Sequence, residues 1–117
     1  MLATLDLFAG VGGFTLGLEE AGGFETKAFC EIDAFAQKVL KKNWPHVLLL
    51  NDVRAIQDNT IDCQIDMITG GFPCQDLSIA GLRGGLIDNE RSGLWRECIR
   101  IVRLFRPKYA VFENVSN

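Results

Sequence analysis

The sequence predicts a single α/β domain in which a mainly parallel sheet is covered by helices on both faces. Three observations predict it. Strand-like and helix-like segments alternate along the chain. The strand-like runs are continuously apolar, as in strands that are buried on both sides. The length of 117 residues, 48% of them hydrophobic, suffices for one core and crowds two. We therefore expect residues 1–117 to form one doubly wound domain.

The first half of the chain predicts two strands and two helices. TLDLFAG (4–10) is a short apolar run that ends in glycine, and GFTLGLEEAGG (13–23) follows as a helix with glycines at its C-terminal end. FETKAFCEID (24–33) indicates the second strand. Asp33 then caps a helix with an apolar face, which Pro45 ends.

Three more strands and the longest helix are predicted after residue 45. HVLLLNDV (46–53) and IDMITGG (65–71) indicate the third and fourth strands. RSGLWRECIRIVRLFRP (91–107) shows apolar residues at helical spacing, and KYAVFENV (108–115) is the fifth strand. The usual order for this fold class, 3-2-1-4-5, places the fifth strand next to the fourth.

Composition narrows the class of protein. The N-terminus lacks a basic region and no apolar run approaches the length of a membrane span, so we expect a cytoplasmic protein without membrane contact. The cysteines form no C-x-x-C pair and the single histidine, His46, lies near none of them, which predicts free thiols and no metal site. The net charge of −3 disfavours a generic polyanion-binding surface but permits a local basic loop.

A glycine-rich loop follows the first predicted strand. In the segment from residue 6 to residue 13, Gly10, Gly12 and Gly13 permit a tight turn and close approach of the backbone to a ligand. The dinucleotide fingerprint G-x-G-x-x-G fails, because Thr15 stands where its third glycine belongs. The loop therefore does not require a pyrophosphate.

Two acidic residues end the next two predicted strands. Glu31 follows Gly10 by 21 positions, close to the separation at which an acid accepts hydrogen bonds from a ribose. Asp52 ends the third strand and is placed to accept from an adenine amino group. Helix capping or a solvated loop charge is the alternative for either acid alone. Together with the glycine loop, the two acids indicate a nucleoside-bearing cofactor.

A cysteine and a glutamate end the fourth and fifth predicted strands. Cys74 follows the fourth strand behind Pro73, and Glu113 ends the fifth. A thiolate can add to an electron-poor ring carbon while a neighbouring carboxyl group hydrogen-bonds or protonates a ring nitrogen. The alternative, a small buried hydrophobe, is the usual role of a free cysteine, and we assign it to Cys30 and Cys98.

In this order, these motifs resemble those of the C5-cytosine DNA methyltransferase family, which uses S-adenosylmethionine. The matching segments are DLFAGVGGF, the acid of EID, the DV of NDV, GGFPCQDLS and ENV, from Leu5 to Val115. Five matches in order are far more specific than PCQ or ENV alone. The resemblance implies a Rossmann-like sheet of the S-adenosylmethionine-dependent methyltransferase type, incomplete at its C-terminal end.

The resemblance also implies a set of cofactor-binding residues. They would border the methionine and adenosine parts of S-adenosylmethionine, with Glu31 on the ribose and Asp52 beside the adenine. No metal is needed. The implied residues are Phe8, Gly10, Val11, Gly12, Gly13, Glu31, Ile32, Asp52, Val53, Pro73 and Leu94.

Catalysis by the family's chemistry is implied for two residues. Cys74 would attack C6 of a cytosine, Glu113 would engage N3 and the exocyclic amine, and the activated C5 would take the methyl group. The cytosine must first be flipped out of double-stranded DNA, at a cost of about a few kcal/mol. The resemblance also implies that residues 81–93, whose glycines allow movement, close over DNA so that Arg83 and Arg91 meet phosphates. An ordinary flexible surface loop is the alternative. The implied DNA contacts are Gln75, Ser78, Arg83, Arg91 and Asn114.

Later motifs of the family, including its target-recognition region, do not occur in the 117 residues. We therefore expect an N-terminal part of a methyltransferase that is inactive alone. Its fifth strand would be an exposed edge, open to self-association or to a C-terminal half supplied as a separate chain. The source is expected to be bacterial, archaeal or phage, with a restriction-modification setting among the possibilities.

Three other functions remain open from the sequence. A relative that methylates cytosine in RNA, such as tRNA, would share all of these motifs. A non-catalytic S-adenosylmethionine-binding module of a split enzyme would retain the cofactor residues and leave Cys74 without a role. A nicotinamide-dependent oxidoreductase is disfavoured by Thr15 and leaves the pair of Cys74 and Glu113 unexplained.

Overall fold

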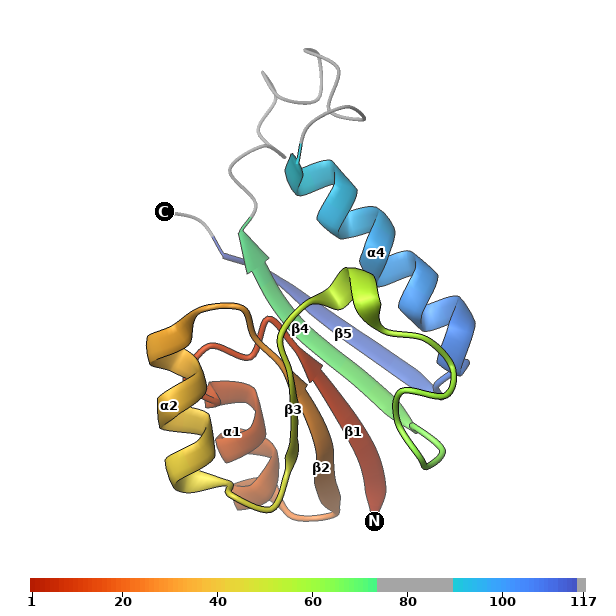
Figure 1. The fold of residues 1–117 in the computed structure, drawn as a ribbon. Helices are drawn as coiled ribbons and strands as arrows, with labels where there is room; N and C mark the ends of the chain where they lie inside the picture. Colours follow the sequence, from red (N-terminus) through yellow and green to blue (C-terminus); the bar gives the residue numbers. More distant parts are fainter. Residues whose placement is uncertain (74–89, 116–117) are drawn as a thin grey trace.

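The computed structural model describes residues 1–73 and 90–115 and shows a five-stranded parallel sheet. The strand order is β3-β2-β1-β4-β5, and every neighbouring pair is parallel (Figure 1). This confirms the predicted fold class and the predicted strand order. The strands are β1 (Leu2–Leu7), β2 (Phe24–Cys30), β3 (Leu48–Leu50), β4 (Met67–Pro73) and β5 (Tyr109–Val115).

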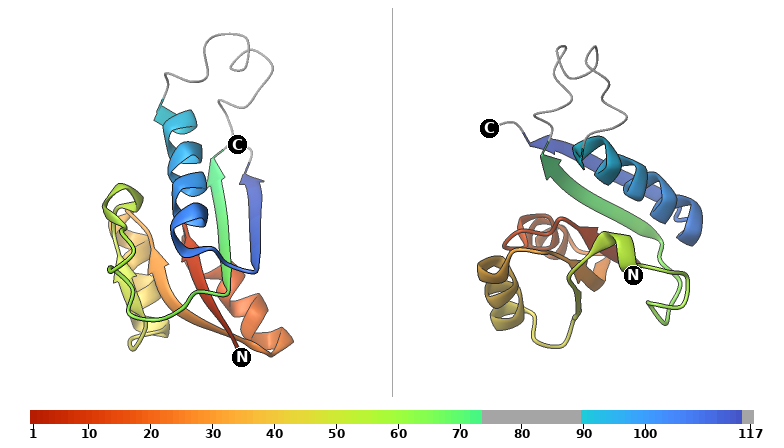
Figure 2. Two further views of the ribbon diagram at one scale, coloured as in Figure 1. Left: turned by 90° about the vertical axis from the view of Figure 1, so that its right-hand side faces the viewer. Right: turned by 45° about the horizontal axis from the view of Figure 1, so that its top comes forward.

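Helices cover both faces of the sheet. α1 and α4 lie on opposite sides of it (Figure 2). The predicted cap of α2 is confirmed, because the Asp33 side chain accepts a hydrogen bond from the Ala36 backbone N–H at 2.9 Å. The helices are α1 (Gly13–Ala21), α2 (Ala34–Asn43) and α4 (Glu90–Phe105), with a short 3₁₀ helix η1 (Val53–Ala55).

Two apolar clusters hold the layers together. Alternate residues of each strand point to opposite faces, so Leu5 and Leu7 of β1 pack with Ile101 of α4, while Phe29 of β2 packs with α2. Phe29 meets the Trp44 ring edge to face, with ring centroids 5.4 Å apart. Full burial of such a side chain stabilises the fold by about 1.5–3 kcal/mol. The core therefore fixes both helix layers against the sheet.

Strand ends differ from the sequence prediction where the loops begin. β1 ends at Leu7, before residue 10, because Phe8 and Gly10 adopt positive φ angles of 52° and 59°. β3 has three residues and does not reach Asp52. The Asp52 side chain instead accepts from the Arg54 backbone N–H at 2.9 Å and caps η1. The prediction that Asp52 ends a strand was therefore wrong, because Asp52 caps η1 instead. Its proposed contact with a cofactor stays a prediction.

The described cysteines are free thiols. Cys30 and Cys98 are buried, as predicted, and Cys63 is exposed. Burial raises the pKa of both buried thiols to about 12, so neither is a nucleophile at neutral pH. Cys74 lies outside the described residues. Among the helices of residues 1–73 and 90–115, none is long and apolar enough to cross a membrane.

β5 forms one edge of the sheet, as the sequence predicts. Within the described chain it pairs with β4 alone. Phe112 packs toward α4, where the Trp95 ring meets it at a centroid distance of 5.4 Å. Tyr109 and Val111, which point to the other face, are 52% and 45% exposed. The edge and one face of β5 are thus available for contact.

Candidate functional site

A cavity of about 380 Å³ opens beyond the carboxyl ends of the parallel strands, which is where ligands bind in sheets of this kind. Its walls come from the segments that follow β1, β2 and β3, from the last residue of β2, from β4, and from α4. Seven residues that the sequence proposed for the cofactor line it: Phe8, Gly10, Glu31, Ile32, Asp52, Val53 and Leu94. Four residues that sequence reasoning missed also line it: Cys30, Asn51, Arg54 and Gly71.

Glu31 joins the glycine loop to the loop after β2. Its Oε1 accepts a hydrogen bond from the Gly10 backbone N–H at 2.7 Å, and its Oε2 accepts from the Asp33 N–H at 2.8 Å. A carboxylate offers about four acceptor sites, so each oxygen retains one for a ligand. The carboxylate is therefore able to accept from two neighbouring hydroxyl groups, such as those of a ribose.

Asp52 and Arg54 form the wall that follows β3. The Arg54 guanidinium lies 3.8 Å from Asp52 Oδ1, and the two side chains are about half exposed. Such a pair contributes little to stability, about 0–1 kcal/mol. Because the backbone N–H of Arg54 also binds Oδ1, Oδ2 stays available to accept from a ligand amino group.

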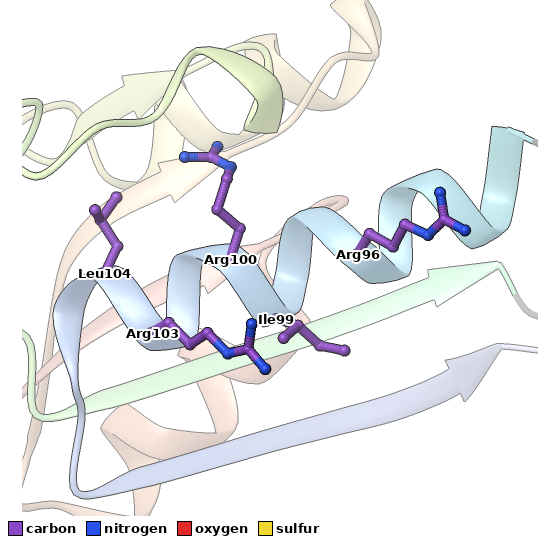
Figure 3. Close-up of a pocket in the computed structure, with 5 residues that line it drawn as sticks. All are labelled: Arg96, Ile99, Arg100, Arg103 and Leu104. Atoms are coloured by element: carbon purple, nitrogen blue, oxygen red, sulfur yellow. The ribbon is translucent and has the colours of Figure 1, made fainter. Parts of the chain in front are cut away.

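Arg100 of α4 holds this wall in place. Its guanidinium donates to the backbone carbonyls of Ile56 and Val53 at 2.7 and 2.9 Å, and it pairs with Glu97 at 2.7 Å. Figure 3 shows the side chain pointing from α4 toward η1. Among the described residues, those that line the hollow of about 540 Å³ in that view all belong to α4: Arg96, Ile99, Arg100, Arg103 and Leu104. It lies on one helix surface, and we assign it no ligand.

Among the described residues that line the 380 Å³ cavity, negative charges outnumber positive ones. Within that set, Glu31 and Asp52 face one guanidinium, that of Arg54. Burial is the largest cause that raises the pKa of the Cys30 thiol, which lies in the same wall. The negative charges of Asp52 and Glu31 raise this pKa further. Such a cavity favours a ligand that carries positive charge over one that carries phosphates.

Three proposed cofactor residues do not line the cavity, namely Val11, Gly12 and Gly13. The side chain of a fourth, Pro73, is not among those described. Val11 is 55% exposed, and Gly13 begins α1. Gly12 has a φ of +94°, and a Cβ atom there would lie 2.4 Å from the Trp44 ring. Packing against Trp44 therefore explains why a glycine stands at position 12. A cofactor role for the four residues stays a prediction.

The proposed catalytic residues belong to adjacent strands. Glu113 of β5 pairs with Gly71 of β4, a residue that lines the cavity, and Pro73 pairs with Val115. The Glu113 side chain is exposed, lies on the face opposite Phe112, and does not line the cavity. Because Cys74 lies outside the described residues, the distance between its thiol and Glu113 stays a prediction.

The side chains of the five proposed DNA contacts are not among those described. Gln75, Ser78 and Arg83 lie outside the described residues. Arg91 and Asn114 belong to the backbone of α4 and β5, and their side chains are not among those described. Contact of these five residues with DNA stays a prediction.

Sequence reasoning missed a buried carboxylate. Asp6 is 1% exposed and accepts hydrogen bonds from the hydroxyls of Thr15 at 3.0 Å and Thr69 at 2.9 Å. Burial raises the pKa of Asp6 to about 6. The available signal was an aspartate within the apolar run TLDLF. Thr15, which breaks the dinucleotide fingerprint, thus has a specific buried partner.

Comparison with known proteins gives one family. The profile of the C-5 cytosine-specific DNA methylase family matches residues 2–117. The type II methyltransferase M.HgiBI of Herpetosiphon aurantiacus is 46% identical over 115 residues, which are 96% of this chain and 25% of that protein. The type II methyltransferase M2.BsuMI of Bacillus subtilis is 39% identical over 118 residues, covering 97% of this chain and 29% of that protein.

Solved structures agree. A putative DNA modification methyltransferase encoded within an E. coli prophage superposes with a TM-score of 0.79 at 34% identity, over 99% of this chain and 32% of that one. A mutant of Spodoptera frugiperda DNMT2 has a TM-score of 0.58 at 29% identity, over 64% of this chain and 24% of that one. The chain thus spans about a quarter to a third of these relatives. It belongs to the C-5 cytosine-specific DNA methylase family.

Proposed function

We propose that residues 1–117 are the cofactor-binding and catalytic subdomain of an enzyme that transfers a methyl group from S-adenosylmethionine to C5 of cytosine in double-stranded DNA. One observation carries the proposal. Glu31, bound to the glycine loop at Gly10, faces a cavity that also includes Gly71 on the strand that leads to Cys74. The family match and the names of the type II relatives support the reaction class.

The residues present fit S-adenosylmethionine. Glu31 offers two acceptor sites to the ribose hydroxyls, and Asp52 offers Oδ2 to the adenine amino group, beside Val53. S-Adenosylmethionine carries a sulfonium and an ammonium group, which suit the two carboxylates and one guanidinium found among the described lining residues. A nicotinamide dinucleotide would bring the negative charges of a pyrophosphate to the same wall. The cavity therefore favours S-adenosylmethionine over the dinucleotide.

The proposed chemistry uses the chain's own thiol and carboxyl group. The Cys74 thiolate adds to C6 of a flipped-out cytosine, and Glu113 stabilises the electron density that the addition pushes toward N3. C5 thereby becomes nucleophilic. Bound S-adenosylmethionine supplies the electrophilic methyl group. A base then removes the C5 proton, and the electron pair of that C–H bond restores the ring double bond while Cys74 leaves from C6.

Contacts beyond the cavity complete the proposal. Gln75, Ser78, Arg83, Arg91 and Asn114 would contact the DNA. Because the relatives are three to four times as long as the matched segment, we propose that methyl transfer needs further polypeptide. The exposed edge of β5 would pair with a strand of that polypeptide, supplied in the same chain or separately, or with a second copy. The bacterial and viral relatives suggest a cytoplasmic enzyme of similar origin.

Covalent trapping tests the reaction. The chain, complemented by the C-terminal region of a type II relative, is incubated with S-adenosylmethionine and DNA that contains 5-fluorocytosine, from which no C5 proton can be removed. We expect a stable protein–DNA adduct that Cys74→Ser abolishes. Cys63→Ser, which alters an exposed thiol, should leave the adduct intact as the matched control.

The same experiment separates the alternatives. An adduct with tRNA that contains 5-fluorocytosine, and none with DNA, would identify an RNA methyltransferase. Binding of S-adenosylmethionine without an adduct on either nucleic acid in the complemented enzyme would identify a non-catalytic module. Both results contradict the proposed DNA methylation.

A further inference from the structure

A buried polar network lies at the base of the glycine loop, outside the residues that line the cavity. Thr15 Oγ1, in the first turn of α1, donates to Asp6 Oδ2 at 3.0 Å, and Thr69 Oγ1 of β4 donates to Asp6 Oδ1 at 2.9 Å. Thr15 Oγ1 also lies 2.8 Å from Thr26 Oγ1 of β2. Because Thr15 gives its single hydroxyl proton to Asp6, Thr26 donates to Thr15. One carboxylate thus connects α1, β1, β2 and β4.

The network closes the loop that carries the proposed cofactor contacts. Asp6 and Thr15 stand on either side of residues 7–14, so the hydrogen bond between them joins the two ends of the loop. Inside the loop, the Gly12 N–H donates to the Ala9 carbonyl at 2.9 Å. At the cavity, the Gly10 N–H donates to Glu31. The loop is therefore held at its base by Asp6 and at its tip by Glu31.

A carboxylate is a costly choice for this place if its role is only structural. Asp6 is 1% exposed, and none of the described ion pairs includes it. Desolvation and the nearby negative charge of Glu31 both disfavour its ionised form. An amide or apolar side chain would avoid that cost. The retained charge therefore points to a role in binding.

We propose that Asp6 is a positioning residue, which through Thr15 and Thr69 fixes the glycine loop in the conformation that accepts S-adenosylmethionine. This inference rests on the proposed function. Hydrogen bonds to an ionised group are stronger than neutral ones, so the loop is held best when Asp6 is ionised. The charged group that affects Asp6 is Glu31, which follows β2 and raises the pKa of Asp6. α1 and β4 contribute the hydroxyls of Thr15 and Thr69.

Two matched substitutions test the positioning role. Thr15→Val removes the hydroxyl that binds Asp6. Thr4→Val makes the same change on β1, at a residue that is 0% exposed and whose Oγ1 has no hydrogen-bond partner among the described residues. Calorimetry with S-adenosylmethionine at pH 7.5 should show affinity about tenfold weaker in Thr15→Val, as for loss of one hydrogen bond, and unchanged in Thr4→Val.

Two further readouts separate positioning from general stability. Amide exchange at Gly10 and Gly12, measured without ligand, should be faster in Thr15→Val, and in Thr69→Val as a second variant, than in Thr4→Val. The affinity of the unmodified chain for S-adenosylmethionine should fall below about pH 6, where Asp6 takes up a proton. In Asp6→Asn this inflection should be absent.

Three results would overturn the inference: Thr15→Val binding and exchanging like Thr4→Val, exchange that is unaffected in both variants of the network, or an inflection near pH 6 that persists in Asp6→Asn. If the unmodified chain binds no S-adenosylmethionine at any pH, the proposed function fails instead. Amide exchange would then still decide whether Asp6 and Thr15 hold the loop.

Discussion

Gly12→Ala is expected to destabilise the chain by about 3–5 kcal/mol, a large part of the 5–15 kcal/mol that holds a typical domain folded. Two costs add. Gly12 has a φ of +94°, a conformation that costs an L-residue about 1–2 kcal/mol. The new Cβ would also lie 2.4 and 2.7 Å from two atoms of the Trp44 ring, closer than real contacts allow.

Trp44 cannot easily yield to that methyl group. Its indole N–H donates to Glu19 at 2.7 Å, and its ring packs against Phe29 in the core between the sheet and α2. Urea unfolding should therefore show a much lower midpoint for Gly12→Ala. Gly10→Ala is the matched control, because Gly10 also has a positive φ, +59°, but no atom of the part of the chain that the structure describes lies within 4 Å of its added Cβ. Equal destabilisation by both substitutions would refute the packing role of Gly12.

Asp6→Asn is expected to make the chain more stable at pH 8, by about 2 kcal/mol. The pKa of Asp6 is about 6 in the folded chain, against 3.8 for an ordinary aspartate. Between these pH values the folded state retains a proton that the unfolded state releases. The free energy of unfolding therefore falls as the pH rises from about 4 to 6, and a cost of up to about 3 kcal/mol is present in full above pH 6.

Asparagine avoids this cost and can keep the network. Its Oδ1 can accept from Thr69, its amide can donate to Thr15, and Thr15 can then donate to Thr26. Urea unfolding from pH 4 to pH 8 should show an advantage for Asp6→Asn that shrinks toward zero near pH 4. Thr4→Val should follow the pH dependence of the unmodified chain. An advantage that grows as the pH falls would contradict the assignment of a raised pKa to Asp6.

The sheet and much of the cavity were predictable because their signals are local. Apolar runs indicated the strands, and the rule that ligands bind at the carboxyl ends of parallel strands brought Gly10 and Glu31 together. Their 2.7 Å hydrogen bond agrees with that expectation. Asp52 was harder to place, because an acid after an apolar run fits a strand end and a helix cap equally well. Its bond to the Arg54 N–H shows that it caps η1 instead of ending β3.

The remaining features depend on contacts between distant residues. Gly12 meets Trp44, and Arg100 binds carbonyls 44 and 47 positions away. Asp6 meets Thr69 across 63 positions. Nothing in the sequence near any of these residues specifies its partner. Packing of the helices on the sheet creates these pairs, and for that reason the buried network escaped prediction.

Titration of the ¹⁵N-labelled chain with S-adenosylmethionine, followed through its backbone amides by NMR, tests whether this cavity binds the cofactor. Saturable shifts should map to Gly10, Glu31 and Val53. Glu31→Gln should weaken the affinity about tenfold or more, because its amide would oppose the Asp33 N–H where Oε2 now accepts. Glu25→Gln, at an exposed acid of β2 that pairs with Lys27, should bind normally.

If S-adenosylmethionine binds at this cavity, the amides on both sides of the Gly10–Glu31 hydrogen bond should shift together at one dissociation constant. No saturable shift, or shifts confined to the outer surface of α4, would contradict the account.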